Sequence, residues 1–171
     1  MRNETVIIAI DPGATGAIVY KNPNLPERCP NVTIAKMPET EREMWDKIRE
    51  IADYAEDHGL EIIAFFEKVG FHRKGNSASA SVKFATNVGL CRMALTAAKI
   101  PYVSETPQKW MKALPITLPD DKDLNLRKKK RKKTIREYVQ RRYPHAIGIT
   151  DATADAVGML SYMEDVYLAG R

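Results

Sequence analysis

Four acidic residues stand where folding could bring their carboxylates together. Asp11 and Glu67 each follow an apolar run of strand length, and Asp151 and Asp155 are four positions apart, a spacing that places both on one face of a helix. Carboxylates gathered in this way repel one another unless a divalent cation neutralises them. Oxygen ligands favour Mg²⁺, with Mn²⁺ as a substitute, over zinc.

Such a site could cleave phosphodiesters. Two ions about 4 Å apart can stabilise both the attacking water and the leaving oxygen of a phosphate ester. We therefore predict a catalytic and metal-binding site with two ions, formed by Asp11, Glu67, Asp151 and Asp155. Structural interpretations stay open: Asp11 could serve an Asp-Pro-Gly turn, and the helix pair could stabilise a helix N-terminus. Glu67 needs a partner in any case, because it directly follows a buried run.

The elements that must position these acids can be predicted from periodicity. We expect strands over residues 5–11, 17–20, 32–35, 60–66 and 100–103, and helices from Thr40 to Gly59, over 82–99, over 106–114, from the basic run to about 143, and over 151–167. Three antiparallel strands followed by crossover helices indicate an α/β fold with a mixed five-stranded sheet flanked by helices. If the first and fourth strands are parallel neighbours, Asp11 and Glu67 leave the sheet at the same edge.

Positive charge is concentrated near the predicted acidic site. The chain has a net charge of +5 and a run of cations followed by Arg136, namely Arg127, Lys128, Lys129, Lys130, Arg131, Lys132 and Lys133. A run of this kind is either a solvated face or a surface for a polyanion, and we expect it to contact DNA phosphates.

The loop after Glu67 is a second candidate DNA contact. It starts just after Glu67, so it should lie over the metal edge, and it carries Phe71, His72, Arg73 and Lys74 between glycines. Phe71 could stack on an exposed base, or it could pack back against the sheet as a core residue.

Composition and chain pattern argue against membrane proteins, secreted proteins and cysteine-ligated metal sites. The 171 residues are 44% hydrophobic, which suits one globular domain over 1–171, and no apolar run is long enough to span a membrane. The first residues lack a secretion signal, so we expect a cytoplasmic protein. Cys29 and Cys91 are expected to be free thiols, because they are far apart in sequence and have no metal-ligand spacing.

Short motifs occur in order across nearly the whole chain. They are Ile10-Asp11-Pro12-Gly13-Ala14-Thr15-Gly16, Phe66-Glu67-Lys68-Val69, Ile100-Pro101-Tyr102-Val103 followed by Thr106-Pro107, Trp110 and Lys112, then Tyr143-Pro144, and Asp151 with Asp155-Ala156. Together they resemble the RuvC family of Holliday junction resolvases. The resemblance implies an RNase H-like fold and a Mg²⁺-dependent crossover junction endodeoxyribonuclease that cleaves branched DNA in recombination and repair. Bacterial members space their last two acids three apart rather than four, which leaves open which of the two is the closer metal ligand.

Proteins of other functions share some of these features. The Asp11 turn also resembles the phosphate loop of actin-like kinases, but those need two such domains. An RNase H-like RNA-processing nuclease, or a non-catalytic nucleic-acid-binding module, stays open. A homodimer is expected, because a resolvase cuts two strands symmetrically, and the small residues of the helix over 82–99 would allow close packing of two copies. Packing of that helix on its own sheet is the alternative.

Overall fold

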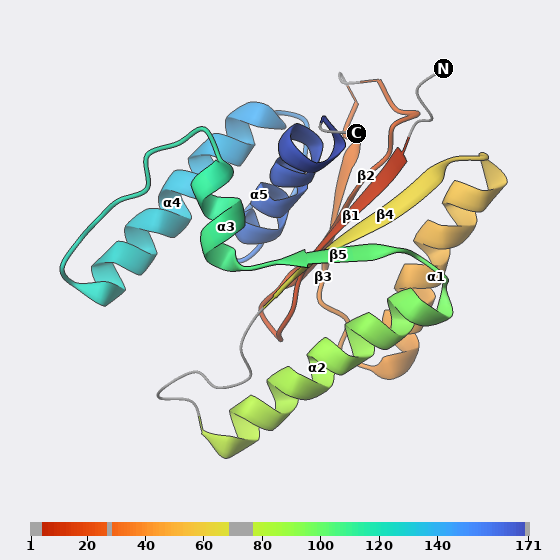
Figure 1. The fold of residues 1–171 in the computed structure, drawn as a ribbon, viewed down its shortest axis with the longest axis horizontal. Helices are drawn as coiled ribbons and strands as arrows, with labels where there is room; N and C mark the ends of the chain where they lie inside the picture. The colour runs from red at the N-terminus through yellow and green to blue at the C-terminus, as the bar shows by residue number, and fades with distance from the viewer. Residues whose placement is uncertain (1–4, 27–28, 69–76, 170–171) are drawn as a thin grey trace.

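A mixed sheet of five strands runs through the centre of the molecule, in the order β3-β2-β1-β4-β5 (Figure 1). The structure, a computed structural model, describes residues 5–26, 29–68 and 77–169. The strands are β1 Thr5–Asp11, β2 Ala17–Lys21, β3 Val32–Lys36, β4 Glu61–Glu67 and β5 Tyr102–Glu105. β1, β2 and β3 pair antiparallel, whereas β4 pairs parallel with both β1 and β5. The predicted α/β fold with a mixed five-stranded sheet is confirmed.

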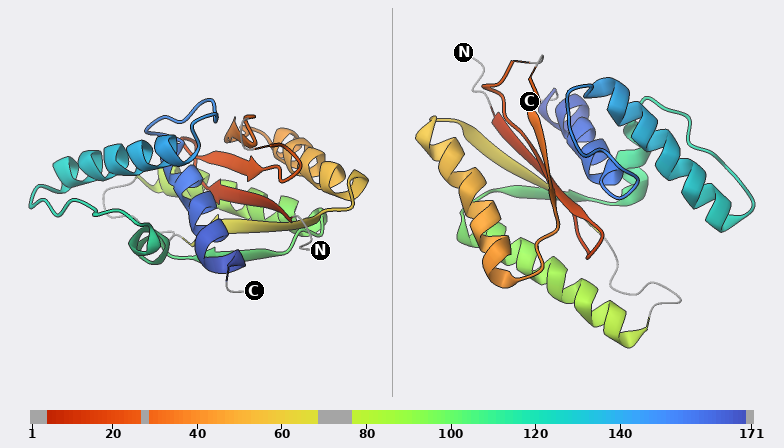
Figure 2. Two further views of the ribbon diagram at one scale, coloured as in Figure 1. Left: turned by 90° about the horizontal axis from the view of Figure 1, so that it is seen from above. Right: turned by 180° about the vertical axis from the view of Figure 1, so that it is seen from behind.

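Helices cover both faces of this sheet. They are α1 Glu41–Asp57, α2 Ala78–Ala97, α3 Pro107–Ala113, α4 Leu124–Arg142 and α5 Ala154–Tyr162, and α5 continues into the π-helical η1 Met163–Leu168. Figure 2 shows α1 and α2 on one face and α3, α4 and α5 on the other. No helix among the described residues is long and apolar enough to cross a membrane.

Each face of the sheet has its own hydrophobic core. Along β1, Ile7 and Ala9 join the core under α3, α4 and α5, while Val6, Ile8 and Ile10 join the core under α1 and α2. This is the alternation that a strand buried on both sides requires. It also determines the face on which a residue at the end of a strand lies.

Local capping signals explain where α1 and α2 begin. The predicted capping box is present, because Thr40 Oγ1 accepts from Glu43 N–H and the Glu43 carboxylate accepts from Thr40 N–H. The backbone bonds from Glu39 and Thr40 lower the pKa of Glu43, as expected for a carboxylate held in its charged form. Helix α2 begins at Ala78 rather than 82, since Ser77 Oγ accepts from Ala80 N–H and caps it.

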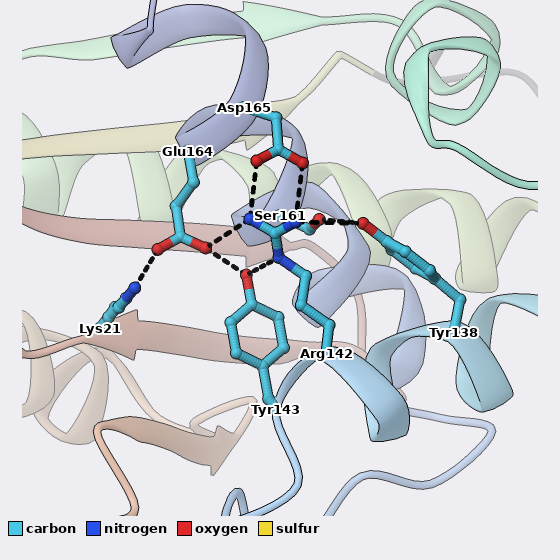
Figure 3. A network of polar contacts seen from close by, with 7 residues as sticks. All are labelled: Lys21, Tyr138, Arg142, Tyr143, Ser161, Glu164 and Asp165. Carbon is cyan, nitrogen blue, oxygen red and sulfur yellow. Dashed lines mark hydrogen bonds and ion pairs between the residues drawn. The ribbon is translucent and has the colours of Figure 1, made fainter. Parts of the chain in front are cut away.

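The carboxyl-terminal end of α4 is tied to η1 by a polar network (Figure 3). Arg142 donates to both carboxylate oxygens of Asp165, at 2.7 and 2.9 Å, and to Glu164 at 3.4 Å. Glu164 also accepts from Tyr143 and Lys21. Burial and the nearby Glu164 carboxylate raise the pKa of the Tyr143 phenol, which stays protonated and donates. This network anchors one end of α4, whose other half carries the basic run.

The two cysteines are free thiols, as expected. Cys91 is fully buried in the core on α2, and this burial raises its pKa to about 12. Cys29 is half-buried in the segment between β2 and β3.

Candidate active site

Two carboxylates lie side by side at one edge of the sheet. The parallel register of β1 and β4 pairs Ile10 with Phe66, so the next residues, Asp11 and Glu67, end neighbouring strands. Neighbouring strands are about 4.8 Å apart. Alternation places both acids on the face that α5 covers, because Ala9 and Phe65, two residues earlier, belong to the core on that face.

The turn after Asp11 holds the end of β1 in place. Gly16 N–H donates to the Gly13 carbonyl at 2.8 Å, and a Cβ on Gly16 would lie 1.9 Å from the Asp11 carbonyl oxygen. Only glycine can occupy that position. Gly13 has a φ of +117°, and its N–H donates to Asn87 Oδ1 of α2 at 2.8 Å. The motif glycines therefore fix the backbone that carries Asp11.

Glu67 is held by a tryptophan. The Glu67 side chain lies in the core with 6% exposure, and Trp110 Nε1–H of α3 donates to its Oε1 at 3.0 Å. Trp110 itself is 1% exposed. A buried carboxylate needs such donors, because desolvation of an unpartnered charge is costly. The partner that the sequence required for Glu67 is therefore found on the short helix α3.

Close packing of α5 on Trp110 brings the final helix to this edge. A Cβ on Gly158 would approach the Trp110 ring to 3.1 Å and Ile135 Cγ2 to 3.3 Å. Both contacts are tighter than an ordinary side chain allows without movement of its neighbours. The absence of a side chain at Gly158 therefore lets α5 lie directly on the indole that binds Glu67, and Asp155 stands one turn before that contact.

Asp155 combines burial with an unpartnered oxygen. It lies in the first turn of α5, where the helix dipole favours an anion. Its side chain is 15% exposed, and its Oδ2 lies 3.5 Å from an Arg131 guanidinium nitrogen of α4. Within the described residues, Asp155 Oδ1 is buried without a hydrogen-bond partner, and so is Arg131 Nε. The pair is therefore electrostatically matched but incompletely hydrogen-bonded.

Asp151 is not on the face of α5 with Asp155, contrary to the sequence expectation. The helix begins at Ala154, and Asp151 lies in the preceding turn with 57% side-chain exposure. Thr153 accounts for the difference: its Oγ1 donates to the Gly148 carbonyl and accepts from Thr150 N–H, so it stabilises the turn instead of a helix. Asp151 forms an ion pair with Arg136 at 2.7 Å.

The described residues contain no group of three or more His, Cys, Asp or Glu side chains arranged to hold a metal ion. The acidic edge nevertheless fits a hard cation in its chemistry. Its donors are carboxylate oxygens, which Mg²⁺ prefers. Asp155 Oδ1 is a buried anionic oxygen without a hydrogen-bond donor among the described residues, and a cation could compensate its charge.

Two solved structures share this arrangement of elements over nearly their whole length. RuvC from Thermus thermophilus, in complex with a Holliday junction substrate, has a TM-score of 0.60 and 16% identity, covering 98% of this chain and 97% of that one. Another T. thermophilus RuvC structure has a TM-score of 0.55 and 17% identity, with 96% of each chain covered. The chain has the RuvC fold. No family model and no curated protein matches the sequence.

In this RuvC fold the predicted basic run forms the first half of α4, next to the acidic edge. Arg136 and Arg131 pair with Asp151 and Asp155, and Lys132 Nζ donates to the Asp151 carbonyl at 3.2 Å. The other cations of the run are exposed, namely Arg127, Lys128, Lys129, Lys130 and Lys133. The predicted contact residues Phe71, His72, Arg73 and Lys74 lie outside the described residues.

Sequence reasoning does not identify two residues at this edge of the sheet, Trp110 and Glu105. Trp110 was noted only as part of a motif, and nothing in its spacing showed that its indole faces Glu67. Glu105 ends β5 directly opposite Glu67 and pairs with Lys109 one turn later. The hydrogen bond to Glu105 raises the pKa of Lys109. An acid at the end of a third parallel strand was the signal that could have identified Glu105.

Trp110→Phe tests the bond that holds Glu67. The substitution keeps a ring in the core but removes the donor, so we expect a loss of about 1–3 kcal/mol in the free energy of unfolding, measured with urea. Trp45→Phe on α1, where the indole is half-buried, is the matched control and should cost less. In a Glu67→Gln background the cost of Trp110→Phe should shrink, because bonds to charged acceptors are the stronger ones. Equal costs for the two tryptophans would contradict this role.

Proposed function

We propose that this protein is a Mg²⁺-dependent endonuclease that cleaves four-way DNA junctions. The observation that carries the proposal is the meeting of Asp11 and Glu67 on one edge and one face of the sheet, with the partly unpartnered Asp155 on the helix that covers that face. The RuvC fold supports it, since one of the similar structures is a RuvC bound to a Holliday junction substrate.

The acidic edge would hold the metal. Asp11, Glu67 and Asp155 would supply carboxylate oxygens. Asp151, which stands in the turn before α5, four residues from Asp155, would join after leaving Arg136. Two Mg²⁺ ions, or Mn²⁺ in their place, would supply activation of water and stabilisation of the leaving oxygen.

The chain's own residues prepare that edge. Trp110 fixes one oxygen of Glu67, so this carboxylate keeps a single orientation inside the core. The glycine turn fixes the backbone at Asp11. Gly158 sets how closely α5 approaches the Trp110 ring. Helix α4 brings cations to the border of the acidic edge, where they can bind the DNA phosphates on either side of the cut.

Cleavage with a matched set of substrates tests the proposal. With Mg²⁺ or Mn²⁺ we expect symmetric cuts in a four-way junction, with weaker cutting of a flap and of linear duplex, and none in EDTA. Glu67→Gln and Asp155→Asn should lower cleavage at least about 100-fold, because each removes an anionic metal ligand, while junction binding by fluorescence anisotropy is kept. Glu61→Gln, at the opposite end of β4, is the matched control.

The other outcomes point to other functions. Preferred cutting of an RNA–DNA hybrid would indicate an RNA-processing nuclease. Binding of junctions without cleavage by the unchanged protein would indicate a nucleic-acid-binding module. Full activity in Glu67→Gln would overturn the metal site itself.

We expect helix α4 to strengthen DNA binding without a preference for particular base sequences. Replacing the exposed Lys128, Lys129 and Lys133 by Gln should weaken binding to junction and duplex alike. The slope of log K against log salt should flatten by roughly 0.9 for each phosphate that is no longer neutralised. A triple variant elsewhere on the surface, at Lys36, Lys47 and Lys99, controls for net charge. An unchanged slope would show that this face of α4 points away from DNA.

A homodimer through α2 is part of the proposal. Val82, Thr86, Gly89 and Met93 follow one another at helical spacing on its exposed side, with Val82 64% and Met93 61% exposed. A Cβ on Gly89 would meet nothing within 4 Å, so a second helix could approach closely there. Two copies would present two cutting sites to a symmetric junction.

Light scattering at micromolar concentration should give the mass of a dimer. Met93→Glu should shift it to a monomer, because a charge would be buried between the two helices. Val166→Glu introduces the same charge at another exposed apolar position, on η1, and should leave the dimer intact. A monomeric unchanged protein, alone and with junction DNA, would refute the dimer.

A further inference from the structure

A pocket of about 570 Å³ lies between α3, the first half of α4 and the segment that joins them. Its apolar lining comes from Met111, Ile116, Leu118, Pro119 and Leu124. Leu124, at the start of α4, is 67% exposed, so its side chain is accessible to a ligand in the pocket. A pocket of this size is in the range that small ligands occupy.

The polar lining of the pocket is entirely cationic apart from one amide. Lys112 stands on the α3 side, Arg127, Lys128 and Arg131 stand on the α4 side, and Gln108 supplies the amide. No carboxylate is among the described lining residues. Arg127 is paired with Asp120 at 3.7 Å, but Asp120 is 98% exposed, and an exposed pair of this kind is weak enough to exchange for a phosphate.

This pocket adjoins the candidate active site through two residues. Arg131 both lines the pocket and pairs with Asp155. Met111, in the pocket wall, directly follows Trp110, whose indole binds Glu67. A ligand in the pocket is therefore separated from Asp155 by one side chain, that of Arg131.

We propose that this pocket receives one unstacked nucleotide of the DNA strand that is cut. The inference rests on the proposed function and names how that site takes its substrate. The aliphatic lining matches the flat faces of a base, and the cations match the phosphates on either side of it. Gln108 can both donate to and accept from the edge of a base, which makes the pocket a candidate source of sequence preference.

Charge favours a nucleotide over a second copy of this chain. A protein segment docking here would have to be acidic as well as apolar to neutralise the four cations that line the pocket. The chain itself is basic, with a net charge of +5. DNA supplies a negative charge with every nucleotide, so a single residue of the strand can satisfy both kinds of lining at once.

Abasic substitution tests the pocket without cleavage. Four-way junctions carrying one abasic site, moved nucleotide by nucleotide across the crossover, are bound to the unchanged protein in EDTA and followed by anisotropy. We expect one position where loss of the base weakens binding by about tenfold, since a bound unstacked base contributes about 1–3 kcal/mol. In Leu124→Ser the same abasic site should cost less than twofold, because the pocket no longer binds the base.

Leu126→Ser is the matched control, since it changes an exposed leucine of the same helical turn that does not line the pocket. It should keep the tenfold effect. Lys128→Gln and Lys129→Gln form a second pair with equal charge change, of which only Lys128 lines the pocket. Circular dichroism and urea unfolding show whether each variant is folded. A separate variant, Gln108→Ala, should change which base is preferred at the sensitive position.

Each of the following outcomes counts against either the pocket or the proposed function. An abasic effect that persists in Leu124→Ser, or that vanishes equally in Leu126→Ser, overturns the pocket. A change from dimer to monomer in Leu124→Ser would show that the pocket holds a second copy instead. If the protein binds junctions but does not cut them with Mg²⁺, the proposed nuclease function fails while the abasic test still stands. If no DNA form binds, both are wrong.

Discussion

The bond between Glu67 and Trp110 is the interaction on which the rest of the candidate site depends. A carboxylate that is 6% exposed at the end of a strand would be costly in the core without a donor. The indole N–H supplies one, and the same ring packs against Gly158 of α5. One side chain thus joins β4, α3 and α5. The distance of Asp155 from the strand-end acids follows from how closely α5 can approach that ring.

Opposite charges organise the surface around this buried contact. Helix α4 carries a run of cations that would repel one another in isolation, and acids on neighbouring segments lie against them. Asp121 faces Lys130, and Asp151 faces Arg136. Most of these pairs are exposed and contribute little to stability, so phosphates could replace the acids at small cost. The pair of Arg131 and Asp155 is different, because both side chains are largely buried and each has an unpartnered polar atom.

Much of the fold could be predicted because its signals are local and strong. The β-branched run over Thr5–Asp11, the capping box at Thr40 and the strand that ends at Glu67 each follow from a short pattern. The position of Asp151 could not be predicted, since a threonine just before a helix-like run can cap a helix or stabilise a turn, and Thr153 does the latter. Trp110 and Glu105 depend on which strands and helices meet in space. The spacing around Trp110 does not contain that information, whereas Glu105 could have been found only from its place at the end of a parallel strand.

Arg131 belongs both to the acidic edge and to the pocket between α3 and α4. Its guanidinium stands between Asp155 and the pocket that α3 and α4 enclose, and its Nε has no partner among the described residues. A cation bound at the unpartnered Oδ1 of Asp155 would weaken the attraction between this carboxylate and Arg131, which lies near Oδ2. The guanidinium, which is largely buried, would then be stabilised by a further anion, since an uncompensated buried charge is unstable. A phosphate of a strand bound in the pocket, as proposed above, would supply that anion, because Arg131 also lines the pocket. Occupation of the acidic edge by metal and occupation of the pocket by DNA should therefore favour each other, and thermodynamic linkage makes that coupling reciprocal.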